Sequence, residues 1–413
     1  MANDQKEVCG NNRYFPGQGA GIMKNPHRSI VTGLLDSFDE MKRIRHDIHQ
    51  HPELGYQERR TGAIVADCLE RWGYRVRRRV GGTGVVGTLR AGTGKRSIGL
   101  RADMDALPIG EASGRSYSSV HEGVMHACGH DGHTAMLLAA AKQLAADRAF
   151  SGTLNVIFQP AEEGGAGALA MLNDGLFDQA PCDSVYALHN YPTPTLKFGQ
   201  MAIGTGAIMA SVDSFIVVVS GRGGHAASPH FTRDPIVVSA SIIQALQTIV
   251  SRNLSPYDCA VVSVTSIHAE GAFNVIPGEL EMKLSVRTYD EAQRSLILSR
   301  IRDIVQSQAA CFGASAQIKE AGAHYPVLVN AEEPAREARE VALRHFGEDS
   351  VADHPPIMAA DDFAFMAQRV PGCYINIGAG EGAALHNAGY DFNDDLILVG
   401  GSFWVHLAQT LLR

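Results

Sequence analysis

The chain has 413 residues, of which 45% are hydrophobic and 19% are charged, a balance typical of a globular enzyme with room for two domains. Its formal net charge of −8 gives no electrostatic support for binding nucleic acid. No run approaches the roughly 18 apolar residues of a membrane span, and residues 1–30 lack the apolar core of a signal peptide. We therefore expect no nucleic-acid or membrane partner, and we expect residues 1–30 to form an N-terminal tail.

The cysteines indicate the cellular compartment. There are seven, widely scattered and never in C-x-x-C spacing, which argues against a disulfide framework or a four-thiolate zinc ribbon. A reducing cytoplasm fits this usage best. Most of these cysteines should be small core residues.

The first half of the chain predicts helices that alternate with apolar strands. The expected helices are 31–50, 60–73, 133–147 and 164–174, and the expected strands are 74–80, 84–90, 96–102, 153–160 and 184–190. Such alternation is typical of an α/β sheet covered by helices on both faces. A dinucleotide-like "GTGVVG" at 82–87 precedes a strand rather than a helix, so we interpret it as a turn.

The pattern changes near residue 210. Strands begin at 211 and continue at 260–268, 279–288 and 314–321, with helices at 235–252 and 290–311. Two strand-helix-strand repeats predict an independent α+β unit inserted into the first domain. The expected division is 31–206 with 323–413 for the discontinuous domain and 207–322 for the insertion. After about 325 the chain resumes helix and strand.

The stretch "MHACGHDGHTAM" at 125–136 carries the first candidate chemistry. Cys128 and His130 alternate, so an extended segment directs both toward one point. His133 follows at the entry to a helix, and Asp131 could cap that helix or orient an imidazole. Thiolate and imidazole together favour zinc, with nickel, cobalt and manganese as alternatives when carboxylates complete the site.

Further candidates lie where other strands end. "RADMD", "FQPAEE" and "ALHN" each follow an apolar strand, and functional residues of such sheets cluster at those ends. Of the adjacent carboxylates Glu162 and Glu163, one could bind metal while the other accepts a proton; the alternative is two solvated loop glutamates. His189 and, near the C-terminus, His386 are further candidates, although a histidine of this kind taken alone is more often structural.

Rival chemistries lack their motifs. There is no G-x-S-x-G around Ser402, and Arg96 follows Lys95 where a phosphate loop needs Ser or Thr. A thiol enzyme using Cys128 as nucleophile would leave both glutamates without a role.

Together these motifs resemble one family from about residue 40 to 410. It is the dinuclear metallopeptidase and amidohydrolase family of aminoacylase and glutamate carboxypeptidase, in the branch with hippurate hydrolase, auxin-conjugate (IAA-amino acid) hydrolases and N-acyl-amino-acid amidohydrolases. The matching stretches are "HQHPELGYQE", "LRADMDALPI", "MHACGHDGHTAMLL", "FQPAEEGGAGA", "ALHN", "GRGGHAASPH", "FNVIPG" and "LHNAGYDFND".

The resemblance implies a zinc-peptidase-like α/β catalytic domain with a mixed sheet, in which an inserted lid and dimerisation domain forms a homodimer or dimer-based oligomer. It implies five ligands for two divalent cations, zinc or manganese before nickel or cobalt: Cys128, His130, Glu163, His189 and His386. Glu162 matches the general base and acid. Asp103 and Asp131 are expected to orient the ligand side chains without binding the cations themselves.

Three residues of the insertion match substrate-facing positions. His225 matches a lid histidine that helps hold the oxyanion and in related dimers reaches the partner's site; Asn274 has a similar role. Arg287 falls near the expected substrate carboxylate, but "LSVR" departs from the usual Gly-Thr-x-Arg. "ADDF" (360–363) replaces Ser-Glu-Asp-Phe and Ala388 replaces a proline, so these departures bear on specificity.

The implied activity is hydrolysis of N-acyl or N-aroyl amino acids by attack of a metal-bound hydroxide on the amide carbonyl. Hippurate-like, auxin-conjugate-like and N-acetyl substrates all fit. The alternatives are a dipeptidase or carboxypeptidase with the same site, or a metal-binding sensor without activity. Glu162 argues against the sensor, which has no need of a base.

Overall fold

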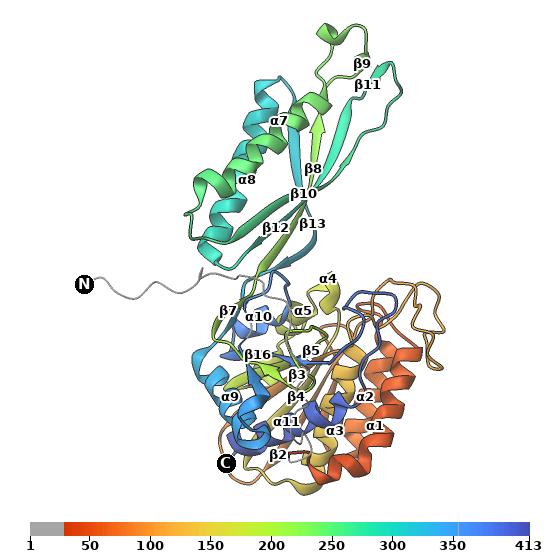
Figure 1. Ribbon diagram of the computed structural model, residues 1–413, viewed down its shortest axis with the longest axis vertical. Coiled ribbons are helices and arrows are strands. Elements are labelled where there is room, and N and C mark those ends of the chain that lie inside the picture. The colour runs from red at the N-terminus through yellow and green to blue at the C-terminus, as the bar shows by residue number, and fades with distance from the viewer. Residues whose placement is uncertain (1–28, 354) are drawn as a thin grey trace, which may run out of the picture.

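The computed structural model describes residues 29–353 and 355–413 and shows two units, one above the other in Figure 1. The expected tail, residues 1–30, lies outside this part except for its last two residues. The lower unit is built on an eight-stranded sheet and the upper unit on a four-stranded sheet.

The sheet of the lower unit is mixed. Its strands are β1 (Arg75–Val80), β2 (Gly84–Ala91), β3 (Ser97–Asp103), β4 (Gly152–Gln159), β5 (Ser184–Tyr191), β6 (Met201–Ala202), β15 (Val351–Ala352) and β16 (Gly372–Gly378). They follow the order β1-β2-β4-β3-β5-β16-β6-β15. The neighbours β4, β3, β5 and β16 run parallel, so their carboxyl ends lie at one edge.

Helices cover both faces of this sheet because its central strands carry apolar side chains on both faces. In β4, Leu154, Val156 and Phe158 belong to one buried cluster, whereas Ile157 belongs to another. Five helices pack on the first cluster: α1 (Thr32–Gln50), α2 (Arg59–Arg71), α3 (His130–Asp147), α9 (Glu332–Phe346) and α11 (Leu396–Leu411). Three short ones pack on the second: α5 (Gly167–Asn173), α6 (Leu176–Gln179) and α10 (Phe363–Ala367).

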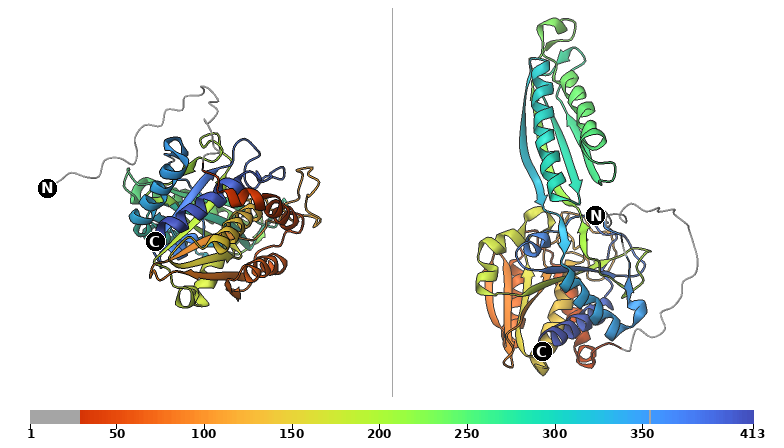
Figure 2. Two further views of the ribbon diagram at one scale, coloured as in Figure 1. Left: turned by 90° about the horizontal axis from the view of Figure 1, so that it is seen from below. Right: turned by 90° about the vertical axis from the view of Figure 1, so that its left-hand side faces the viewer.

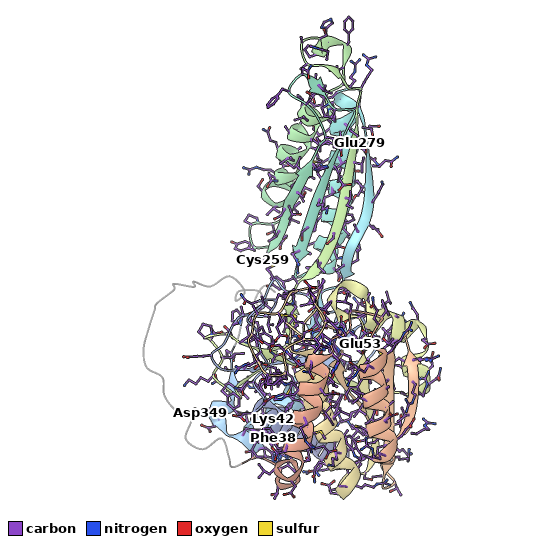
Figure 3. The ribbon with its side chains drawn as sticks, turned by 90° about the vertical axis from the view of Figure 1, so that its right-hand side faces the viewer. Phe38, Lys42, Glu53, Cys259, Glu279 and Asp349 are labelled. Atoms are coloured by element: carbon purple, nitrogen blue, oxygen red, sulfur yellow. The ribbon has the colours of Figure 1, made fainter. Side chains whose placement is uncertain are left out.

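The upper unit has a sheet and a core of its own. Its strands β8 (Ser211–Ser220), β10 (Ala260–His268), β12 (Glu279–Thr288) and β13 (Ser315–Tyr325) are antiparallel in the order β10-β12-β8-β13. Helices α7 (Pro235–Thr248) and α8 (Glu291–Cys311) pack along one face (Figure 2). Figure 3 places Cys259 beside the lower unit and Glu279 farther out, so β10 leads away from the lower unit and β12 returns.

Two adjacent strands join the units. The chain leaves the lower unit through β7 (Gly206–Met209) into β8 and returns through β13 into β14 (Leu328–Asn330). Both crossings are paired, Val212 with Tyr325 and Met209 with Leu328. At the far end, β9 (Gly224–His225) and β11 (Val275–Ile276) form a small hairpin-like tip (Figure 1).

One helical segment of the described chain, Pro235–Asn253, is long and apolar enough to cross a membrane by length and composition alone, with a mean hydropathy of 1.2. It comprises α7 and the π-helical turn η3 (Ile249–Asn253). Val238, Ile242 and Leu246 on one side of it are buried in the core of the upper unit. Core helices pass the same test, so this is weak evidence for a span.

One expected helix is interrupted. The sequence predicts a helix over 164–174, but the chain forms α4 (Glu162–Gly165) and then α5, divided at Ala166, whose φ is +53°. The helix expected at 133–147 begins earlier, at His130. The expected domain division and the lid role of 207–322 stay predictions.

Candidate active site

The candidate residues gather at the carboxyl edge of the parallel strands. Glu162 and Glu163 follow β4, and His189 lies near the end of β5. His130 is the first residue of α3, and Cys128 lies two residues before it. These strands are neighbours or next neighbours in the sheet, so their ends meet. His386 comes from the C-terminal part of the chain. Its backbone N–H donates to the carbonyl of Ala127 at 2.8 Å, which brings it beside Cys128.

The five predicted ligands form one cluster. Ligand atoms of Cys128, Glu163 and His386 lie within 4.8 Å of one another, as do those of His130, Glu162 and Glu163. Cys128 Sγ is 3.5 Å from His189 Nε2, and His386 Nε2 is 3.1 Å from Glu163 Oε1. Glu163 is therefore common to both groups.

The imidazoles are arranged as metal ligands usually are. His130 Nδ1 lies 3.1 Å from Asp105 Oδ1, and its Nε2 is buried without a hydrogen-bond partner. His189 Nδ1 lies 2.7 Å from the carbonyl of Asn190, which leaves its Nε2 facing Cys128. In a ligating histidine, one ring nitrogen is typically held by a hydrogen bond on the side away from the metal, and the other nitrogen is free to bind the metal. A thiol, three imidazoles and a carboxylate fit a pair of first-row divalent cations.

His133 lies beside this cluster but has no free ring nitrogen. Its Nδ1 is 2.5 Å from Asp103 Oδ1 and its Nε2 is 2.5 Å from Asn190 Oδ1. The other oxygen of Asp103 accepts from Arg101 at 2.7 Å and lies 3.7 Å from His130 Nε2. Burial opposes ionisation of Asp103, but His130 and Arg101 outweigh it and hold the pKa of this carboxyl well below its usual range.

Asp131 has a different environment from the one expected of a cap. Gly129 precedes α3 and no side chain caps the helix, so the capping interpretation is wrong. The buried carboxylate of Asp131 instead lies 2.9 Å from His49 Nδ1 and 3.2 Å from Arg45. It joins α1 to the segment that carries the candidate ligands. The expected supporting role of Asp131 toward the ligands stays a prediction.

Asp105 is a functional candidate that the sequence reasoning missed. One of its oxygens lies against His130 Nδ1, and the other accepts the backbone N–H of Glu163 at 2.9 Å. A single carboxylate thus orients one candidate ligand and fixes the backbone of another. The available signal was the second acid of "RADMD", two residues after Asp103.

Glu162 stands beside the cluster in a buried, acidic environment. Its neighbours Asp361 and Asp362 have carboxylate oxygens within 4.8 Å of its own. Burial first, and then the charges of Asp361 and Glu163, raise the pKa of Glu162 well above its usual range. Arg101, itself buried, offsets this charge with contacts to Asp361 at 3.2 Å and Asp362 at 3.3 Å.

A pocket of about 290 Å³ opens onto these residues. Its lining includes Glu162 and four of the five predicted ligands, Cys128, Glu163, His189 and His386, and the apolar side chains of Met209, Val212, Ile357 and Leu385. Among the described lining residues, Arg287 is the one Lys or Arg, and its guanidinium donates to the carbonyl of Met358 at 3.0 Å. The structure therefore brings Arg287 to the predicted site.

His225 and Asn274 are brought together with each other but lie away from this pocket. His225 pairs with Val275 in the tip formed by β9 and β11, and Ala226 N–H donates to the carbonyl of Asn274 at 2.9 Å. Figure 1 shows this tip at the end of the upper unit farthest from the lower unit. Within a single chain, these two residues do not line the pocket.

Comparison with known proteins identifies the family. A family model described as Peptidase family M20/M25/M40 matches residues 99–410. The chain belongs to this family. Among its M20 relatives, the hippurate hydrolase of Campylobacter jejuni is 43% identical over 386 residues, which are 93% of this chain and 100% of the relative. The N-acetyl-L-cysteine deacetylase of Bacillus subtilis is 37% identical over 370 residues, 89% of this chain and 87% of the relative.

A solved structure supports the same family assignment. The YXEP protein of Bacillus subtilis, described as a dinuclear metal-binding M20 peptidase, matches with a TM-score of 0.78 at 30% identity, over 92% of this chain and 99% of that one. The predicted family and the predicted mixed α/β fold class are thereby confirmed. The M20 chain is a hydrolase with a candidate metal site in the cluster described above.

Proposed function

We propose that the protein is a metal-dependent amidohydrolase that cleaves N-acyl or N-aroyl amino acids into a carboxylic acid and a free amino acid. The observation that carries this proposal is the position of Glu162, which lies within 4.8 Å of the predicted ligands His130 and Glu163 and lines the same pocket as Arg287. The M20 relatives named above, a hippurate hydrolase and an N-acetylcysteine deacetylase, support this substrate class.

Cys128, His130, Glu163, His189 and His386 would hold two divalent cations, which we expect to be zinc or manganese, with nickel and cobalt as alternatives. When bound, such a pair supplies a water of lowered pKa and positive charge beside the carbonyl oxygen. The Glu162 carboxylate takes a proton from the attacking water and delivers it to the nitrogen of the leaving amine.

The pocket fits the two ends of such a substrate. The Arg287 guanidinium can hold the carboxylate of the amino-acid part by charge-assisted hydrogen bonds. The apolar side chains of Met209, Val212 and Ile357 suit a hydrocarbon or aromatic group. A dipeptidase or carboxypeptidase shares the same chemistry and would differ in this pocket.

We expect the protein, reconstituted with zinc or manganese, to hydrolyse N-benzoylglycine, N-acetyl amino acids or indole-3-acetyl amino acids faster than dipeptides. Chelation should abolish turnover, and added metal should restore it. The matched amide, N-benzoylglycinamide, lacks the carboxylate and should lose about 10- to 100-fold in kcat/KM because Arg287 loses its partner. Faster dipeptide cleavage would favour the peptidase alternative, and a fully metallated protein without turnover would favour the sensor.

We further propose that the upper unit is a lid through which two copies pair as a homodimer. Two exposed apolar features support it: Ile236 and Val237 of α7, 49% and 52% exposed, and the outer edge strand β10 with Ile267 at 56%. Pairing of this face would place the tip, with His225 and Asn274, near a second copy. His225 then shares the developing oxyanion charge in the site of that copy.

A mixture of two inactive variants tests this arrangement. Glu162→Gln and His225→Ala homodimers should each turn over slowly while keeping their metals. In a random hybrid mixture, half of the dimers carry one site with both Glu162 and His225, so about a quarter of wild-type activity should return. Hybrid dimers can be isolated by giving each variant a different affinity tag. If their activity does not exceed that of the two variant homodimers, His225 does not act in the site of the other copy.

A cytoplasmic location and the absence of nucleic-acid and membrane partners remain predictions from composition and cysteine usage.

A further inference from the structure

The backbone that carries Glu162 and Glu163 is strained. Two alanines of segment 161–168, here called the catalytic loop, adopt the left-handed region: Ala161 with φ +49° and Ala166 with φ +53°. Inside the loop Glu163 has a non-helical ψ of 72°. Left-handed alanines persist only where the surrounding structure fixes them.

Four side chains of the lower unit hold this loop by its backbone. They are Glu58, which accepts Ala161 N–H at 2.7 Å; Asp105, which accepts Glu163 N–H at 2.9 Å; Asp362, which accepts Ala168 N–H at 2.9 Å; and Tyr56, which donates to the Gly165 carbonyl at 2.6 Å. None of them bonds the carbonyl of Glu162.

That carbonyl is bound by Tyr325, which comes from the other unit. The Tyr325 hydroxyl donates to the Glu162 carbonyl at 2.6 Å and accepts the Ala166 N–H at 3.3 Å. Tyr325 is the last residue of β13, is 4% exposed, and pairs with Val212 where β8 enters the upper unit. One hydroxyl thus joins both ends of α4 to the strand by which the chain returns from the upper unit.

We propose that Tyr325 is a positioning residue that ties the catalytic loop to the junction of the two units and fixes the Glu162 carboxylate for proton transfer. The inference rests on the proposed function in one respect, the role of Glu162 as base. The geometry makes Glu162 placement depend on the junction, because any rotation of β13 at this point moves the hydroxyl that holds the Glu162 carbonyl.

Tyr325→Phe removes the hydroxyl and keeps the ring. The matched control is Tyr74→Phe, because the Tyr74 hydroxyl is also buried and donates to a backbone carbonyl, that of Ala141 at 2.9 Å, outside the site. Hydrogen exchange of peptide 161–168 in the metal-loaded protein should be about fivefold faster in Tyr325→Phe than in wild type. In Tyr74→Phe that peptide should exchange as in wild type.

Kinetics give the second readout. Tyr325→Phe should lose about tenfold or more in kcat with KM within about twofold and two metals still bound, because a misplaced base slows chemistry without weakening binding. Unchanged exchange of 161–168 would overturn the proposal, and so would faster exchange with wild-type kcat. If wild type hydrolyses no member of the substrate panel, the proposed function fails, and the exchange experiment alone decides whether Tyr325 holds the loop.

Discussion

Substituting Glu162→Gln is expected to reduce turnover by about 10²–10⁴-fold or beyond detection while metal content stays near that of wild type. The glutamine side chain has nearly the same shape, but its amide cannot accept and return a proton. Glu162 lies near the cluster without being one of its five predicted ligands, so the cations should keep their donors. Metal analysis of the purified variant, together with kcat on the best N-acyl amino acid, measures both effects.

The neighbouring carboxylate provides the comparison. Glu163 belongs to both groups of ligand atoms, so Glu163→Gln should lose metal and activity together. An active, fully metallated Glu162→Gln protein would contradict the assignment of Glu162. A Glu163→Gln protein that keeps two metals would contradict the assignment of Glu163.

Substituting Arg101→Leu should destabilise the fold by about 3–5 kcal/mol, because it leaves buried carboxylates without a counter-charge. Arg101 is 2% exposed and contacts Asp103, Asp361 and Asp362. Arg101 is one of the charges that hold the folded-state pKa of Asp103 well below its usual range, so its loss should raise that pKa and let the folded variant bind more protons than the folded wild type. The deficit should therefore shrink as pH falls from neutrality toward the ordinary carboxyl range, which chemical denaturation at several pH values would show.

Arg78→Met is the control for the loss of an arginine with two carboxylate partners. Arg78 contacts Asp67 at 2.6 Å and Glu70 at 2.9 Å, but all three side chains are substantially exposed. Its substitution should change the free energy of unfolding by less than about 1 kcal/mol. Equal stability of the two variants would show that the buried arginine does not compensate the carboxylates beneath the site.

The ligand cluster was largely predictable because it follows from the edge of a parallel sheet. Polar residues after β3, β4 and β5 must meet wherever those strands are neighbours, and Cys128 and His130 are only two residues apart. His386 was a candidate from the sequence itself, but its assignment to the cluster depended on the family resemblance, since nothing local indicates that its segment reaches Ala127. The same resemblance indicated Arg287, which the structure places in the pocket.

Other features depend on partners distant in sequence. Asp131 resembles a helix cap locally, yet Arg45 and His49 bind it from α1. The sequence does not predict the helix break at Ala166, because alanine favours helix and its left-handed backbone here is fixed by Tyr325 and the surrounding loop contacts. Asp105 lies in the motif "RADMD" but its role appears only in its contacts with His130 and Glu163, and Tyr325 lies in no motif that we singled out.

The position of β16 has a consequence for how the protein is made. This strand, residues 372–378, lies in the sheet between β5 and β6, so one strand inside the lower sheet is synthesised only after the whole upper unit. The upper unit is contiguous and has its own core, and it can therefore fold while the lower sheet still lacks a strand. The edge of β5 has no neighbouring strand until residue 378 leaves the ribosome. Ribosome-bound chains that have not reached this length are therefore the species in which β5 is most exposed to pairing with a wrong strand.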